Sequence, residues 1–421
     1  DNFAAKLSFN DYQRDGTIEN IVTGNWINEQ DNQSYRGQLT GKLSDKLSFH
    51  LSFDNLSSDR LSFDGSAITN TLGTAINTEV SDKDKVSLTI DPREKREISG
   101  EILTIDWQFD NGYLLRSISG HRESNIKYVN DFDYSVKDAA FFNYEDDYSQ
   151  LSQEIQLISP IGQFQYVAGL YYYQQDAFTD RRPTVQDDAI EVFTGVPRDV
   201  IEYGASIGDP RSQFLLAGFY PGELSSIGTV DTTSYAFFFN SSYQFTDKFS
   251  LDLGFRYSEE EKEVDWAISS IEAGSGIPII PILRLATGEV KDKDSYDDFS
   301  PLISLNYQFD SRTHSYFKYS TGYKSGGFNV DFLRQAQLEA GIAFDKETVE
   351  SFEIGLKGST SDYALTYRAA LFSSQYDDFQ VNQLIALGSG ATAISVRNAA
   401  KVDTKGLELE LNYQYQQYEF F

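Results

Sequence analysis

The chain has 421 residues, with 64 Asp and Glu against 35 Lys and Arg, and its formal net charge is -29 at pH 7. Such an acidic chain argues against nucleic acid as a partner, because phosphate binding depends on clustered Lys and Arg. The sequence has no cysteine, which excludes disulfides, thiolate nucleophiles and cysteine-ligated metal sites, and its 31 Phe and 27 Tyr are too many aromatic residues for a disordered chain.

Alternation of apolar and polar residues with a period of two recurs along the whole chain and predicts about fourteen β-strands. It is clearest at 249–257, where every odd position from Phe249 to Tyr257 is apolar and every even one is small, polar or charged. A strand with this pattern has one apolar and one polar face. The same pattern appears at 47–53, 303–309 and 407–415, and helical periodicity is nowhere sustained. The strands are expected to begin near Ala4, Tyr35, Lys46, Glu97, Tyr113, Ser149, Gln163, Thr232, Lys248, Pro301, Thr313, Thr348, Tyr363 and Thr404.

The connections between these strands alternate between short and long. Tight turns are predicted at 44–45, 110–112, 160–162, 246–247, 310–312 and 359–362, and long segments at roughly 14–34, 59–96, 127–148, 177–231, 260–300, 324–347 and 380–403. Short turns at one end of a sheet and long loops at the other are typical of outer-membrane barrels. No run of about 18 apolar residues, the length of a membrane helix, occurs. The predicted fold class is therefore all-β, a transmembrane antiparallel β-barrel with long extracellular loops and short periplasmic turns.

Aromatic residues gather where the predicted strands meet the tight turns. Phe245 and Phe249 flank one turn, Trp107 and Phe109 precede another, and Phe309 precedes a third. Rings at this level of a membrane barrel form an interfacial girdle. A soluble all-β sandwich or propeller would also show the alternation and would bury these rings in its core. It does not predict loops that are long on one side only.

Several segments resemble the TonB-dependent outer-membrane receptors. The run from Tyr316 to Asn329, which ends in Tyr-Lys-Ser-Gly-Gly-Phe-Asn, is similar to a strand end that is common in that family. Gly326 and Gly327 let the chain leave a strand in conformations that other residues avoid, and Pro301 stands at a strand start where no ladder N–H is needed, so these motifs suggest scaffold rather than chemistry. Further similarity lies at 14–16, 152–157, 296–301, 347–357, 398–401 and 406–410, in the expected order along nearly the whole chain.

The resemblance implies a barrel of about 22 strands that is occluded by an N-terminal plug. Residues 1–421 would then form an incomplete TonB-dependent receptor β-barrel domain, with the plug and the final strands outside it. Members of the family import scarce nutrients, most often ferric siderophores, by displacing the plug with energy from the TonB–ExbB–ExbD complex, which engages a segment before the plug. The implied location is the outer membrane of a Gram-negative bacterium, with lipopolysaccharide and outer-membrane lipid around the barrel and a small molecule or metal chelate as ligand.

The polar faces of the predicted strands place charged side chains in the barrel lumen, where they would meet the plug or line the substrate route. These lumen candidates are Arg256, Lys318, Glu353, Lys357, Arg368, Glu408 and Glu410. A second set comes from the predicted loop between Phe178 and Val230, whose aromatic and basic residues suit either contact with a ligand from outside or packing against neighbouring loops. These loop candidates are Arg181, Arg182, Phe193, Arg198, Tyr203, Phe219 and Tyr220.

The sequence offers no positive sign of an enzyme. His50, His121 and His314 are isolated from one another, and no phosphate-binding loop, nucleophile elbow or zinc motif occurs. Acidic clusters at 131–133, 145–147 and 292–298 lack the spacing of an EF-hand, so solvated loops are expected there. We therefore expect no catalytic residue, no cofactor and no metal site. Two alternatives to active import stay open: a passive outer-membrane channel or structural barrel, and a soluble all-β binding protein.

Overall fold

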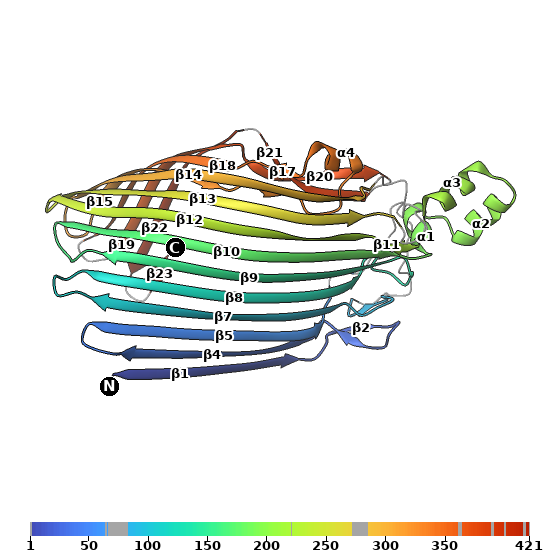
Figure 1. Cartoon of the computed structure of the whole chain (residues 1–421), viewed down its shortest axis with the longest axis horizontal. Helices are drawn as coiled ribbons and strands as arrows, with labels where there is room; N and C mark the ends of the chain where they lie inside the picture. The colour runs from blue at the N-terminus through green and yellow to red at the C-terminus, as the bar shows by residue number, and fades with distance from the viewer. Residues whose placement is uncertain are drawn as a thin grey trace.

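The computed structural model describes residues 2–63, 65, 83–219, 221–271, 285–360, 364–388, 391–399, 401–415 and 418–420. Within them a 16-stranded antiparallel sheet runs through the chain, and each of its long strands is hydrogen-bonded to the next long strand in sequence (Figure 1). The strands, in spatial order, are β1 (Phe3–Arg14), β4 (Gln30–Lys42), β5 (Leu47–Leu61), β7 (Arg93–Gln108), β8 (Leu114–Asp131), β9 (Ala140–Ile158), β10 (Phe164–Val185), β12 (Ser225–Thr246), β13 (Phe249–Ser269), β14 (Gly288–Gln308), β15 (His314–Lys324), β18 (Glu347–Ser359), β19 (Leu365–Asp377), β22 (Val402–Tyr415) and the short β23 (Tyr418–Phe420), with β11 (Gly222–Glu223) paired to the end of β10.

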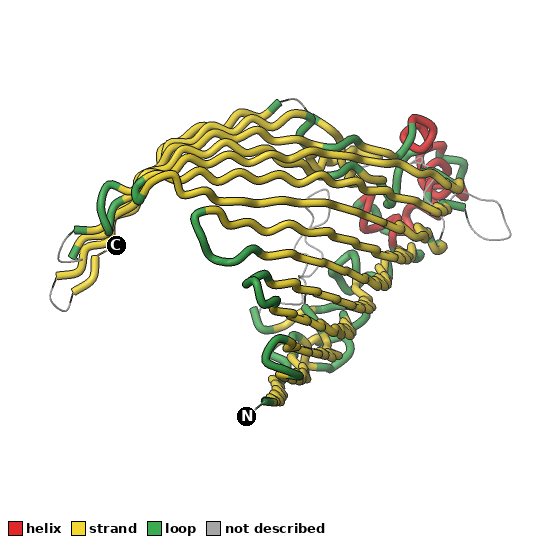
Figure 2. The backbone as a smooth tube through the Cα atoms, turned by 60° about the vertical axis from the view of Figure 1, so that its left-hand side comes forward, coloured by secondary structure: helices red, strands yellow, loops and turns green. Residues whose placement is uncertain are grey.

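The all-β antiparallel architecture predicted from the sequence is confirmed. Figure 2 shows the sheet curving across its width, with β1 and β23 at its two edges. Every predicted strand is present; the one expected near Tyr363 is described from Leu365, because Tyr363 lies outside the described residues. Strands that follow a tight turn begin within two residues of the prediction. Strands that follow a long connection begin earlier than predicted, and β14 shows the largest error, since it starts at Gly288 rather than near Pro301 (301 − 288 = 13 residues).

The strands extend further than the alternation predicts because their apolar side chains change faces. In β13, Leu253 and Tyr257 are exposed on one face, whereas Trp266 and Ile268 are buried on the other. A face that meets lipid is apolar near the tight turns and becomes polar where it meets water, while the opposite face becomes apolar where a loop packs on it. The predicted long segments 127–148, 177–231 and 260–300 were therefore too long, and the connections between these strands are 132–139, 186–224 and 270–287.

The sheet has two chemically different faces, and its central strands extend beyond the lipid-facing band. The outer face carries the exposed apolar side chains, and the inner face is the opposite one. The strand β10 has 22 residues, about twice the 9–11 that a tilted strand needs to cross a bilayer. We call the part of β5 to β14 beyond the last lipid-facing apolar residues the extension, and it comprises residues 54–61, 93–100, 122–131, 140–150, 173–185, 225–234, 258–269 and 288–298.

The tight turns lie at one end of the sheet and the long connections at the other, as predicted (Figure 1). Short helices occur in two of the long connections, although the sequence shows no sustained helical period. They are α1 (Ala189–Thr194), α2 (Arg198–Ser206), α3 (Pro210–Gly218) and α4 (Gln335–Ala340). The carboxylate of Asp209 accepts the Ser212 N–H at 3.0 Å and caps α3. Among the residues that the structure describes, no helix has the length and apolarity needed to cross a membrane.

The buried apolar residues gather at the end of the sheet that carries the long connections. The largest cluster joins the inner face of β13 to the loop 325–346, which contains β16 (Gly327–Phe328), α4 and β17 (Ala343–Phe344). A second small sheet is formed by β2 (Ile18–Asn20), β3 (Trp26–Ile27) and β6 (Lys85–Val86), and a hairpin by β20 (Gln380–Gly388) and β21 (Ala391–Asn398). The described parts of the long connections therefore contribute to small apolar cores at this end of the sheet. The members of the largest cluster are Val264, Trp266, Ile268, Ala286, Phe328, Leu333 and Ile342.

Candidate functional site

The register of the sheet brings side chains from five strands into one transverse row on the inner face of the extension. Arg60 of β5 lies opposite Glu94 of β7, and Glu94 lies opposite Tyr128 of β8. Tyr128 lies opposite Tyr144 of β9, which in turn lies opposite Arg181 of β10. The next row on the inner face adds Arg96 from β7 and Asp146 from β9. We call the whole set the inner cluster: Arg60, Glu94, Arg96, Tyr128, Tyr144, Asp146 and Arg181.

Glu94 is shared by two arginines of the inner cluster. Its Oε1 lies 3.2 Å from Nη2 of Arg60 and 3.3 Å from Nη2 of Arg96. Only 12% of the Glu94 side chain is exposed, against 27% for Arg60 and 39% for Arg96. The Nε atom of each arginine is buried and has no hydrogen-bond partner within the described part of the chain. Two guanidinium groups on one carboxylate leave a surplus of positive charge, which the more exposed Arg96 presents to the surface and which favours an anion.

Arg181 forms the other half of the inner cluster. Its Nη1 lies 3.0 Å from Oδ1 of Asp146, and its guanidinium carbon lies 5.6 Å from the ring centroid of Tyr144, within the range of a cation–π contact. Burial raises the pKa of Tyr144, and the carboxylates of Glu94 and Asp146 raise it further while Arg181 opposes them. The Tyr144 phenol therefore keeps its proton at neutral pH and can donate it. Three arginines against two carboxylates give the inner cluster one net positive charge (3 − 2 = 1).

The loop 325–346 borders the inner cluster. Its apolar side chains pack on Val264 and Trp266 of β13, and the indole Nε1–H of Trp266 donates to Ser226 Oγ of β12 at 2.8 Å. Burial raises the pKa of Asp331 in this loop, and the positive charge of Arg181 lowers it again. Phe332 of the same loop packs against Ala139 and Val185, at the ends of β9 and β10. The loop therefore lies near the end of the strand that carries Arg181, and an ionised Asp331 would offset the single positive charge of the inner cluster.

Amide side chains hold this loop to the β20–β21 hairpin. The Nδ2 of Asn329 donates to the carbonyl oxygens of Ile342 and Val396 at 3.1 Å each, and its Oδ1 accepts the Val396 N–H at 2.7 Å. The Nε2 of Gln380 donates to the Ser325 carbonyl oxygen at 2.8 Å. From β13, Lys262 Nζ donates to Ser325 Oγ at 2.9 Å. The Ser-Gly-Gly-Phe-Asn part of the family-like motif therefore joins two loops, which agrees with its expected structural role.

All seven lumen candidates lie on the inner face. The Nε of Arg256 donates to Ser258 Oγ at 2.9 Å, and Lys318 lies opposite Glu353 in the register of β15 and β18. Tyr316 donates its hydroxyl proton to Glu353 and lies under Lys357, whose Nζ is 5.0 Å from the ring centroid. An ion pair of 3.1 Å joins Arg368 to Glu410, and Glu408 lies opposite Ala370. Their contact with a plug or a substrate stays a prediction.

The loop candidates do not form one site. Arg181 and Arg182 belong to β10 rather than to a loop, and pleating sends Arg181 to the inner cluster and Arg182 to the outer face. Arg198 of α2 is paired with Asp187 and Glu202, and Tyr203 of α2 is 67% exposed. Phe219 packs against a small cluster around Ala139 and Val185. Phe193 belongs to α1, but its side chain is not described, and Tyr220 lies outside the described residues.

Six of the seven members of the inner cluster were not predicted from the sequence. The segment 59–96 contains Arg60, Glu94 and Arg96, and the segment 127–148 contains Tyr128, Tyr144 and Asp146; the sequence predicts both segments as loops. No simple period marks them: in Arg93-Glu94-Lys95-Arg96 the charges run positive, negative, positive, positive, so the inner-face pair Glu94 and Arg96 is recognised only once the strand and its register are known. Among the described residues, no group of three or more His, Cys, Asp or Glu side chains is arranged to hold a metal ion.

Comparison with known proteins identifies the architecture. The family model described as "TonB dependent receptor-like, beta-barrel" matches residues 2–421. The pesticin receptors of Yersinia enterocolitica and Yersinia pestis are 25% identical over 228 residues, which is 50% of this chain and 30% of theirs. The matched segment thus covers less than a third of the length of these curated relatives.

Two solved structures show the same fold. The ferric yersiniabactin uptake receptor FyuA from Yersinia pestis has a TM-score of 0.70 at 16% identity, with 99% of this chain and 54% of that one covered. The siderophore receptor PiuA from Acinetobacter baumannii has a TM-score of 0.65 at 16% identity, with 99% and 58% covered. At these identities the likeness concerns the fold alone.

Proposed function

The chain belongs to the TonB-dependent receptor β-barrel family, and we propose that it is the barrel portion of an outer-membrane transporter that imports an anionic metal chelate, a ferric siderophore above all. This is a family of receptors and transporters rather than of enzymes. The lipid-facing apolar side chains of the outer face agree with a place in the outer membrane of a Gram-negative bacterium.

The inner cluster is the observation that carries this proposal. It lies on the inner face of the extension, beyond the part of the sheet that crosses the bilayer, where a ligand arriving from outside first meets the barrel. The surplus guanidinium charge of Arg60 and Arg96 suits an anionic ligand. The rings of Tyr128 and Tyr144, with centroids 5.1 Å apart, add apolar surface and hydroxyl donors. Relatives named as receptors for ferric yersiniabactin and for a siderophore support this ligand class.

Energy coupling completes the proposal. The lumen candidates from Arg256 to Glu410 would face a plug domain, which the family resemblance places outside residues 1–421. A segment before that plug would engage the TonB–ExbB–ExbD complex, and force on the plug would then open the route past these charges. Charged groups on the barrel wall suit such a step, because ion pairs in water are individually weak and can exchange partners at little cost.

The experiment measures binding and uptake of radiolabelled ferric chelates by the complete receptor under iron limitation, in cells without other uptake routes. The double variant Arg60→Gln with Arg96→Gln should weaken binding by roughly tenfold or more, because hydrogen bonds to charged groups contribute about 1.5–3 kcal/mol each. The matched control is Arg198→Gln with Arg211→Gln, which removes the same charge from α2 and α3 and should bind like the wild type.

The same assay separates the alternatives. A protonophore should abolish uptake and leave binding intact if transport is energy-coupled. Uptake that survives the protonophore would indicate a passive channel, and neither binding nor uptake of any chelate would indicate a structural barrel. Recovery of the complete protein in solution without detergent would indicate a soluble binding protein.

A further inference from the structure

The loop 325–346 fixes one carboxylate, that of Asp331, at the edge of the inner cluster. Val330 packs against the largest apolar cluster, and Phe332 packs against both that cluster and the cluster at the ends of β9 and β10. The next residue, Leu333, is only 1% exposed, and its carbonyl oxygen accepts a backbone N–H at 2.8 Å. The backbone of Asp331 is therefore held on both sides, and its carboxylate cannot move far without unpacking these apolar side chains.

The nearest part of the inner cluster is Arg181. Val185, which belongs to the cluster that Phe332 contacts, lies four residues beyond Arg181 on the same face of β10 (185 − 181 = 4). Burial raises the pKa of the Asp331 carboxyl, and the positive charge of Arg181 opposes this rise and so favours the ionised form. The ion-pair partner of Arg181 is Asp146, at 3.0 Å, so Asp331 acts on the inner cluster through its charge rather than through an ion pair.

The strands around the inner cluster offer no carboxylate in the place of Asp331. The inner-face rows directly above and below the inner cluster are uncharged; their members are Asn130, Phe142 and Pro183 above, and Ile98, Ser124, Tyr148 and Ala177 below. Three arginines and two carboxylates therefore leave the strands with one net positive charge (3 − 2 = 1). The ionised Asp331 of the loop brings this charge to zero.

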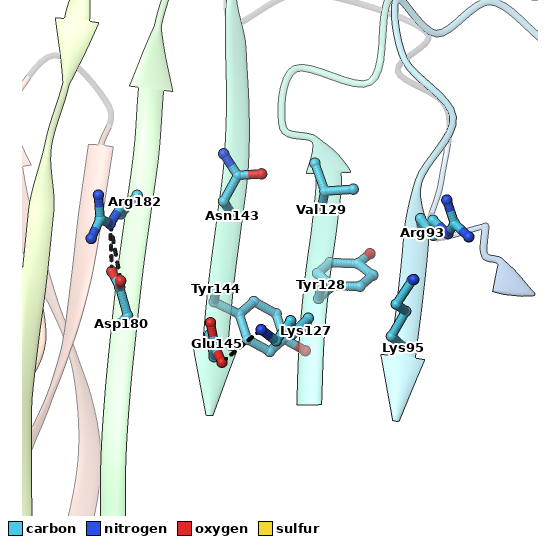
Figure 3. Close-up of a pocket in the computed structure, with 10 residues that line it drawn as sticks. All are labelled: Arg93, Lys95, Lys127, Tyr128, Val129, Asn143, Tyr144, Glu145, Asp180 and Arg182. Atoms are coloured by element: carbon cyan, nitrogen blue, oxygen red, sulfur yellow. Dashed lines mark hydrogen bonds and ion pairs between the residues drawn. The ribbon is translucent and has the colours of Figure 1, made fainter. Parts of the chain in front are cut away.

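The outer-face cations behind Arg181 and Tyr128 do not alter this balance. Figure 3 shows Arg182 paired with Asp180 and Lys127 paired with Glu145, at distances of 2.8 Å and 3.0 Å. Each pair is neutral and lies on the opposite face of the sheet. The charge that a ligand meets on the inner face is therefore set mainly by the inner cluster and by the carboxylate of the loop.

We propose that Asp331 is a specificity-determining residue of the candidate binding site, because its carboxylate cancels the last positive charge of the inner cluster and so disfavours chelates with several negative charges. This rests on the proposed function, in which the inner cluster receives a ferric chelate. A ferric ion bound by three catecholates carries three negative charges, and one bound by three hydroxamates carries none. One catecholate with two hydroxamates leaves a single negative charge. The site selects chelates at the low end of this series.

Coulomb's law gives the size of the effect. Two unit charges about 10 Å apart in water change a binding constant by about twofold. Removal of the charge of Asp331 should therefore tighten binding by about twofold for each negative charge on the chelate, which amounts to about eightfold for the tris-catecholate. Physiological salt should reduce these factors, because the Debye length there is about 8 Å.

The test compares three variants of the complete receptor with the wild type at low salt. Asp331→Asn removes the charge and keeps an oxygen that can accept the Phe332 N–H, and Asp331→Glu keeps the charge. Glu339→Gln is the matched control, because it removes one negative charge from an exposed position of α4 in the same loop. Dissociation constants are measured for the ferric tris-hydroxamate, the mixed chelate with one catecholate, and the ferric tris-catecholate. Each constant is divided by that of the wild type, which cancels differences in shape between the chelates.

In Asp331→Asn the dissociation constant should be unchanged for the tris-hydroxamate, about twofold lower for the mixed chelate and about eightfold lower for the tris-catecholate. In Asp331→Glu and Glu339→Gln it should stay within about twofold of the wild type for every chelate. No change in Asp331→Asn, an equal change for all three chelates, or the same dependence on charge in Glu339→Gln would overturn the proposal and leave the proposed import intact. A wild type that binds none of the three chelates would overturn both.

Discussion

Replacing Trp266 by alanine should detach the loop 325–346 from the sheet while leaving the membrane-spanning part folded. Trp266 is only 1% exposed and is the largest side chain of the cluster that joins β13 to Phe328, Leu333 and Ile342. Its indole N–H donates to Ser226 Oγ at 2.8 Å, and Ser226 is itself fully buried. Val264, Ile268 and Ala286 also anchor the loop, and Trp266 contributes the largest apolar surface among them.

The size of the effect follows from these contacts. Loss of a buried Trp side chain costs about 3–5 kcal/mol, and a buried hydroxyl left without its donor adds about 1–3 kcal/mol. Part of this cost is recovered if the loop opens and admits water, so we take about 4 kcal/mol for the local opening. At about 1.4 kcal/mol per tenfold change, amide exchange in the loop should accelerate about a thousandfold. Trp266→Phe keeps most of the packing and should cost about 1–2 kcal/mol.

Hydrogen exchange with mass spectrometry measures this directly. The reporters are the Asn329 N–H, which donates to the Ile342 carbonyl oxygen, and the Ala286 N–H, which donates to that of Leu333, both at 2.8 Å. Trp26→Ala is the control, because Trp26 is 55% exposed and should give a change of no more than about 0.5 kcal/mol. Unchanged exchange at the reporters in Trp266→Ala would refute the reasoning, as would loss of protection that spreads to β4 and β5.

Three further outcomes are expected. Burial raises the pKa of Asp133 to about 7, and the nearby charge of Asp131 adds a smaller contribution. The Asp133 carboxyl then holds a proton in the folded turn that it lacks in the open turn, so the stability of the turn should fall as pH rises from about 4 to about 7. Amide exchange in the turn whose free energy of opening does not depend on pH in this window would contradict the prediction. Asn329→Leu removes three hydrogen bonds and should speed exchange in the β20–β21 hairpin as well as in the loop 325–346; faster exchange in one loop alone would show that the loops are independent. Asp209→Ala removes the cap of α3 and should destabilise that helix by about 1 kcal/mol, seen as faster exchange in 210–218 with no change in the sheet.

Much of the architecture follows from local sequence. The alternation around Phe249 to Tyr257 identifies a lipid-facing strand because side chains point to opposite faces at every second residue. Tight turns such as 246–247 fix where strands begin, since a short turn leaves no freedom in the pairing that follows. The antiparallel strand order therefore follows from the pattern without any knowledge of long-range contacts, whereas the family rested on the resemblance of segments such as the run from Tyr316 to Asn329.

The long ends of the strands do not follow from local sequence. Beyond Tyr257 the outer face of β13 meets water rather than lipid, and its apolar residues move to the inner face at Val264 and Trp266. Apolar residues occupy whichever face of the strand is shielded from water. The alternation therefore shifts by one residue where the shielded face changes from the outer to the inner one. The partner that makes the inner face apolar is the loop 325–346, which lies about sixty residues further along the chain and is invisible to a period of two.

The functional cluster depends on the same tertiary contacts. Arg60 and Glu94 are 34 residues apart, and only the register of β5 and β7 places the Arg60 guanidinium on that carboxylate. Arg181 and Arg182 are adjacent and look like one basic pair in the sequence. Because successive side chains of a strand point to opposite faces, they lie on opposite faces of β10. The sequence by itself determined the number, order and lipid-facing side of the strands, because these depend on period and turn length. Tertiary structure decided which charges meet, because hydrogen-bonded register between distant strands is a property of the assembled sheet.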